Sequence, residues 1–183
     1  MVENNLGGHV HIADSINTWN LQKRMAELKT NGLSIAVVRD YKIVWAKGYG
    51  MADTALKTPV TVQILFQAAS ISKSLNAVGV LKLAQDKKID LDTDINNYLT
   101  TWKFPYDTVS HGKKITVREL LSHTAGLTVH GFGGYTPGDS LPTLPEILDG
   151  KHPANSDAVR SMIAPGLRSE YSGGGITVSQ HSC

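Results

Sequence analysis

Ser70 and Lys73 lie three positions apart in the stretch Phe66–Lys73. A nearly unbroken apolar pattern follows from Leu75 to Ala84 and predicts a helix that is apolar all round, and therefore central and buried. On a helix, residues three apart share a face, so the two side chains are expected to meet. A serine hydroxyl needs an adjacent base to become a good nucleophile, and a desolvated lysine one turn away can supply it. Backbone N–H groups at the helix start can also face the charge that develops on a substrate oxygen.

A second Ser-x-x-Lys pair, Ser110–Lys113, lies in a polar stretch that contains glycine and has no helical pattern after it. We interpret this second pair as a chance match. Spacing alone also leaves an ordinary structural role open for the first pair, with Ser70 as a helix N-cap and Lys73 as a solvated helix residue.

Two further motifs follow. The stretch Thr116–Leu127 opens with a Thr-x-x-Glu capping box, which predicts a short helix from Thr116, and Gly126 is placed to end that helix. The stretch Pro165–Gly175 contains Tyr171 after a Pro-Gly turn and before three glycines.

In this order, the three stretches resemble the serine β-lactamase and penicillin-recognising hydrolase superfamily. The Leu-Leu-Ser-His-Thr-Ala-Gly-Leu run resembles the branch of class C β-lactamases, D-alanyl-D-alanine carboxypeptidases and related esterases, and the resemblance covers residues 12 to 180. It implies a β-lactamase-like α/β fold of the α+β sandwich type, with an N-terminal helix and β-hairpin plus a helical domain. It further implies that Ser70 is the acylated nucleophile, Lys73 its activating partner and Tyr171 the proton shuttle, with Ser172 and Gly173 binding substrate.

The sequence departs from the family pattern in two places. The tyrosine motif commonly has Asn two positions after Tyr, where this chain has Gly173; this favours an esterase or peptidase over an efficient β-lactamase. In the family, a further segment with a Lys-Thr-Gly-like or His-x-Gly-like motif follows, and no such motif occurs after Tyr171. We therefore expect a truncated member without the C-terminal strands of the sheet. The alternative to a hydrolase is a catalytically impaired remnant that at most binds a ligand or a partner.

Patterning divides the chain into two expected parts. Apolar residues at helical spacing predict a helix from Ile12 to Leu28 that stops before Gly32, and alternation predicts strands over residues 33–38 and 43–49. Residues 1–60 would form the N-terminal part of the α/β domain, and residues 61–183 the helical domain with the three motifs. An isolated hairpin is marginal in water, so its open edge predicts a homo-oligomer or a complementing chain.

Composition limits the function classes. The chain has 183 residues, 41% of them hydrophobic, and a net charge of +2, which indicates a packed core and no nucleic-acid surface. The expected partner is a small-molecule ester, peptide or β-lactam. No apolar run reaches membrane-spanning length and no signal peptide is visible, which favours the cytoplasm, or the periplasm or secretion if a signal was removed.

The histidines and the cysteine of the sequence form no recognisable ligand set, so we expect neither a metal nor an organic cofactor. His9 and His11 lack a third ligand, and the single Cys183 excludes an internal disulfide. We interpret His123 and His130 as hydrogen-bonded structural residues rather than as bases or metal ligands.

Overall fold

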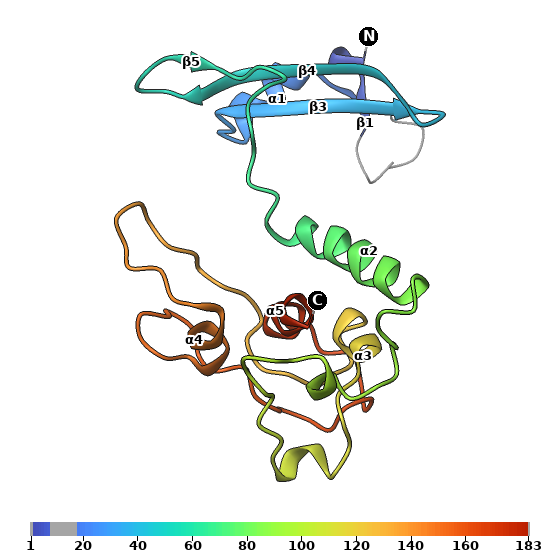
Figure 1. The fold of residues 1–183 in the computed structure, drawn as a ribbon. Coiled ribbons are helices and arrows are strands. Elements are labelled where there is room, and N and C mark those ends of the chain that lie inside the picture. Colours follow the sequence, from blue (N-terminus) through green and yellow to red (C-terminus); the bar gives the residue numbers. More distant parts are fainter. Residues whose placement is uncertain (1, 8–17, 183) are drawn as a thin grey trace. The chain divides into compact units, whose positions relative to one another are not determined.

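The structure, a computed structural model, describes residues 2–7 and 18–182, and the chain divides into two compact units, Met1–Gln67 and Ala68–Cys183 (Figure 1). The boundary between the units falls just before Ser70, whereas the sequence placed a boundary after residue 60. The small antiparallel sheets followed by helices agree with the mixed α/β fold class expected from the sequence.

The first unit is built on a three-stranded antiparallel sheet of order β3-β4-β5, with β3 at Gly32–Arg39, β4 at Lys42–Asp53 and β5 at Thr58–Pro59. The predicted hairpin is present, and both central residues of its turn, Asp40 and Tyr41, have positive φ angles of 50° and 60°. Turns with two such residues match the twist of the paired strands, which explains why the hairpin closes here.

The N-terminal helix is shorter than the sequence predicted. Helix α1 spans Leu21–Glu27, and it begins there because the Asn20 side chain accepts a hydrogen bond of 3.0 Å from the Lys23 N–H. Trp19 belongs instead to a short strand, β2 (Thr18–Trp19), paired with β1 (Leu6–Gly7) after the 3-10 turn η1 (Val2–Asn4). The expected helical residues between positions 8 and 17 lie outside the described part of the chain.

The second unit is mainly helical. Its elements are η2 (Ala69–Ile71), α2 (Ser72–Gln85), η3 (Ile95–Asn97), η4 (Thr108–Ser110), α3 (Val117–Leu121), α4 (Leu144–Asp149) and α5 (Gly173–His181). Helix α5 contacts α2, α3 and α4, and its Val178 is fully buried. The core of this unit is apolar and includes Val80, Ile95, Leu99, Trp102, Phe104, Ile115, Val117, Leu120, Ala125, Leu127, Leu148, Val159 and Val178.

Helix α2 is not buried all round, contrary to the expectation from its apolar pattern. Val80 is its one buried residue, whereas the Leu75 side chain is 71% exposed. The reason is that, within the second unit, α2 packs on α5 along the side where Asn76 Nδ2 donates to Ser179 Oγ at 2.8 Å. No helix among the described residues has the length and apolar character needed to cross a membrane.

Candidate active site

Ser70 lies in η2, one turn before the body of α2, and Lys73 lies in the first turn of α2. The expected proximity is present: Lys73 Nζ donates to Ser70 Oγ at 3.1 Å. The residue before the serine, Ala69, has a φ of 44°, a left-handed conformation that is unfavourable for a residue with a Cβ. Strained backbone of this kind is often found at functional sites.

Tyr171 reaches the same serine from the other end of the unit. Its hydroxyl donates to Ser70 Oγ at 3.1 Å, and Lys73 Nζ lies 5.2 Å from the centre of its ring. The adjacent Lys73, followed by the hydrogen bond with Ser70, holds the pKa of Tyr171 below its usual value near 10. A phenol with a lowered pKa gives up its proton more readily near neutral pH, so it can serve as a base.

The start of α5 fixes the backbone on which Tyr171 stands. Ser172 is the N-cap: its hydroxyl accepts from the Gly175 N–H at 2.9 Å and donates to the Thr128 carbonyl at 2.7 Å. Ser172 is 3% exposed, and its hydroxyl is engaged in both of these hydrogen bonds. The substrate contact expected at Ser172 stays a prediction.

Gly173 lies close to the backbone of a neighbouring loop. A Cβ at this position would lie 2.9 Å from the His130 carbonyl oxygen, closer than side chains tolerate. Gly173 also lines the cavity beside Ser70, so glycine at this position both permits the close approach and leaves the cavity open.

The predicted capping box is present, because the Thr116 and Glu119 side chains each accept a hydrogen bond from the other residue's backbone N–H. The helix does not run to Gly126, however. It ends at Leu121, and His123 adopts the left-handed conformation (φ 57°) that was expected of a glycine. The Thr124 N–H bonds the Glu119 carbonyl at 2.9 Å, which completes a Schellman-type ending around His123.

His123 and His130 lie against Tyr171, which the sequence did not predict. The centres of their rings are 4.4 and 4.7 Å from the centre of the tyrosine ring. The one signal that could have drawn attention to His123 is its place inside the Leu-Leu-Ser-His-Thr-Ala-Gly-Leu run.

A cavity of about 310 Å³ opens beside the serine. It is lined by Ala69, Ser70, Ser72, Lys73, Gly131, Phe132, Gly173, Ile176, Thr177 and Gln180. Residues from η2, α2, α5 and the loop after residue 130 therefore enclose space large enough for the acyl part of a small substrate.

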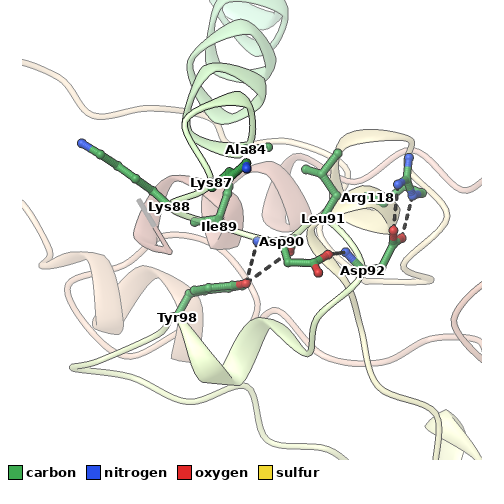
Figure 2. A pocket seen from close by; sticks show the side chains of 9 residues that line it. All are labelled: Ala84, Lys87, Lys88, Ile89, Asp90, Leu91, Asp92, Tyr98 and Arg118. Carbon is green, nitrogen blue, oxygen red and sulfur yellow. Dashed lines mark hydrogen bonds and ion pairs between the residues drawn. The ribbon is translucent and has the colours of Figure 1, made fainter.

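A second cavity, of about 590 Å³, lies beyond the C-terminal end of α2, away from Ser70 at the start of that helix. Figure 2 shows that four of its polar residues pair: the Tyr98 hydroxyl accepts from the Asp90 N–H, and Arg118 makes two hydrogen bonds to Asp92 at 2.7 and 2.8 Å. The described residues that line it include no serine, cysteine or histidine.

The other candidates do not join the site. Ser110 is buried and its hydroxyl donates to the Asp107 carbonyl, while Lys113 Nζ donates to the Pro165 carbonyl at 3.3 Å. His9, His11 and Cys183 lie outside the described residues. Within the described ranges, no cluster of His, Cys, Asp or Glu side chains could hold a metal ion.

A sequence comparison with known families is consistent with this fold and arrangement of side chains. Residues 20–181 match the family described as Beta-lactamase, and the chain belongs to that family.

Individual relatives match only in part. The chain is 36% identical over 103 residues to the serine beta-lactamase-like protein LACTB, mitochondrial, of Bos taurus, a match that covers 55% of this chain and 18% of that protein. Among solved structures, it is similar to the D-amino acid amidase from Ochrobactrum anthropi SV3, with a TM-score of 0.63 and 27% identity over 85% of this chain and 40% of the amidase chain. The Beta-lactamase/D-alanine carboxypeptidase from Pseudomonas syringae has a TM-score of 0.59 and 28% identity, over 88% of this chain and 42% of that chain. The chain thus spans less than half the length of each of these relatives.

Proposed function

We propose that this chain is a serine hydrolase that acts through an acyl-enzyme on Ser70, with an ester, peptide or lactam carbonyl as its substrate. The observation that carries the proposal is the position of Ser70 Oγ, which lies 3.1 Å from both Lys73 Nζ and the Tyr171 hydroxyl. Both groups are close enough to exchange a proton with the nucleophile.

The reaction would use these groups in two halves. In the first, Ser70 Oγ attacks the carbonyl carbon as its proton passes to the Lys73 amine or the Tyr171 phenolate, and the leaving group departs with a proton from Tyr171. In the second, the Tyr171 phenolate removes a proton from water, which attacks the acyl carbon, and Ser70 Oγ leaves that carbon with a proton from Lys73 or from Tyr171. After both halves, Ser70, Lys73 and Tyr171 carry the same protons as at the start, so the enzyme ends unchanged.

The cavity favours esters over β-lactams. Gly173 presents no amide side chain to grip a substrate amide, and a Cβ there would collide with the His130 carbonyl. A simple ester has no amide group to be bound. The absence of an amide side chain at Gly173 therefore weakens the binding of an ester less than that of a β-lactam.

Trapping of the acyl-enzyme tests the proposal. Intact mass spectrometry after brief mixing with p-nitrophenyl acetate should show one acetyl adduct, and peptide mapping should place it on Ser70. Ser70→Ala is the matched control, because activated esters also react with other protein nucleophiles. An adduct that persists at the same level in Ser70→Ala would overturn the assignment.

A further inference from the structure

The Tyr171 ring lies against two imidazole rings. His123 comes from the turn after α3 and is tilted by 35° to the phenol ring at 4.4 Å, and His130 comes from the loop that follows, tilted by 43° at 4.7 Å. These distances are those of favourable offset contacts between aromatic rings. A ring packed against two neighbouring rings loses freedom to rotate away from Ser70.

The same two histidines also bind the backbone on both sides of Tyr171. The Glu170 N–H donates to the His123 carbonyl at 2.7 Å, and the Ser172 N–H donates to His123 Nδ1 at 3.3 Å. The Gly173 N–H donates to the His130 carbonyl at 3.0 Å. Three backbone donors on the two sides of the tyrosine, those of Glu170, Ser172 and Gly173, are therefore bound by these two residues.

The segment that presents the histidines adopts an unfavourable backbone to do so. His123 has a φ of 57°, and Val129, directly before His130, has a φ of 62°, which is rare for a β-branched residue. Such conformations are unfavourable and persist where the surrounding contacts impose them. The geometry is thus maintained at a cost, which points to a role for these two positions.

We propose that His123 and His130 are positioning residues that act as a clamp: their rings pack against the Tyr171 ring, so that its hydroxyl stays within hydrogen-bonding distance of Ser70 and beside Lys73. The proposal rests on the function proposed above for Tyr171, but the position of the phenol can be measured without turnover. In this proposal the two histidines hold the tyrosine in place and do not transfer protons.

The clamp needs a neutral His123, because Nδ1 can accept from the Ser172 N–H only when it carries no proton. Partial burial, followed by the charge of Lys73 and then by His130, lowers the pKa of His123. Among the described residues, Lys73 from α2, His130 from the loop and Tyr171 before α5 are the titratable groups that face this ring. The imidazole therefore remains neutral at neutral pH and gains a proton only as the pH falls below the usual range for histidine.

Two variants separate the clamp from the fold. His123→Asn removes the ring but keeps a side-chain acceptor, and asparagine tolerates the left-handed backbone at this position. His130→Ala removes the second ring and leaves intact the carbonyl that accepts from Gly173. His111→Asn is the matched control, because His111 is an exposed histidine with a φ of 49° at the end of η4, outside the site.

The experiment measures the pKa of Tyr171 by an NMR titration of protein labelled with carbon-13 at the tyrosine ζ position. The Tyr171 signal is assigned as the one that is lost in Tyr171→Phe. We expect the pKa of Tyr171 to move up toward the ordinary tyrosine value of about 10 in His123→Asn and in His130→Ala, since the phenol leaves Lys73 and Ser70. We also expect kcat for a small ester to fall by about 10- to 100-fold with little change in KM, and His111→Asn to match the wild type.

The outcomes are distinct. If the pKa of Tyr171 is the same in both variants as in the wild type while circular dichroism shows a folded protein, the clamp proposal is wrong. If the pKa of Tyr171 rises in the variants but the wild type turns over no ester, the clamp stands and the proposed function fails.

Discussion

The Tyr171 hydroxyl donates a hydrogen bond of 3.1 Å to Ser70 Oγ across 101 positions of sequence. Lys73 Nζ donates to the same oxygen at the same distance, so two groups that can exchange protons converge on one hydroxyl. Helix α2 positions one of them and the start of α5 the other, and these two helices are in contact.

Loss of either proton-transfer partner should abolish turnover. We expect Lys73→Ala and Tyr171→Phe each to lower kcat/KM for p-nitrophenyl acetate by roughly 10²–10⁴, the usual contribution of general acid–base catalysis. Lys113→Ala is the control, because Lys113 bonds the Pro165 carbonyl and lies outside the site. The hydrolysis rates of these variants are compared with the background rate of Ser70→Ala. If ester hydrolysis survives in both Lys73→Ala and Tyr171→Phe, the assignment of Ser70, Lys73 and Tyr171 as the active site is wrong.

Esters should be better substrates than β-lactams. Because Gly173 offers no amide side chain to the cavity, we expect a larger kcat/KM for short activated esters than for a chromogenic cephalosporin. Both rates can be followed by absorbance with the same enzyme preparation. A cephalosporin hydrolysed with comparable kcat/KM would contradict the role assigned to this glycine.

Acid should destabilise the second unit through Asp149. The Trp102 indole N–H, followed by Lys151 and Arg160, lowers the pKa of this carboxyl to about 2. A depressed pKa means that the stabilisation is complete above the unfolded value near 3.8 and is lost as the pH falls toward 2. After allowance for solvent screening, we expect a loss of about 1–2 kcal/mol in the free energy of unfolding.

Urea unfolding of the wild type and of Asp149→Asn at pH 6 and pH 3 measures this contribution. The free energy of unfolding should fall more steeply with acid in the wild type than in Asp149→Asn. Asp40→Asn, at an exposed hairpin turn, is the control and should follow the wild type. Parallel losses in all three proteins would show that Asp149 contributes nothing to the acid response.

The first unit should associate with other chains through its sheet. Within residues 2–7 and 18–182, strand β3 pairs with β4 alone, which leaves an edge, and Val38 on this strand is 63% exposed. Open apolar edges pair with other strands. We expect sedimentation velocity to give an average mass above the monomer's 19.8 kDa that rises with concentration.

Substitution of the edge tests the same prediction. Val38→Lys should shift the distribution toward monomer, since a charge on an edge strand opposes pairing. Leu56→Lys, which places the same charge in the exposed turn between β4 and β5, should not. A single monomeric species at every concentration, with hairpin amides strongly protected from exchange, would show that the edge needs no partner.

The features that the sequence predicted well are those with local causes. The hairpin over β3 and β4 follows from alternation around a short turn, and the start of α3 follows from the reciprocal bonds of Thr116 and Glu119. The proximity of Ser70 and Lys73 follows from helical spacing alone. In each of these cases the interacting residues are close in sequence.

The features that the sequence missed depend on packing between distant segments. The exposure of Leu75 depends on which neighbours cover α2, and the contact of His123 and His130 with Tyr171 depends on two loops that meet α5. The end of α3 at Leu121 was missed for another reason, because His123 takes the left-handed conformation that usually requires glycine.

Labelling with a fluorophosphonate tests the central claim, that Ser70 is the nucleophile, most directly. The serine Oγ displaces fluoride from phosphorus and stays covalently bound, so peptide mass mapping identifies the reactive residue. We expect a single adduct on Ser70 that is absent in Ser70→Ala and forms more slowly in Lys73→Ala. An adduct on Ser72 or Ser110 with Ser70 unmodified would contradict the account.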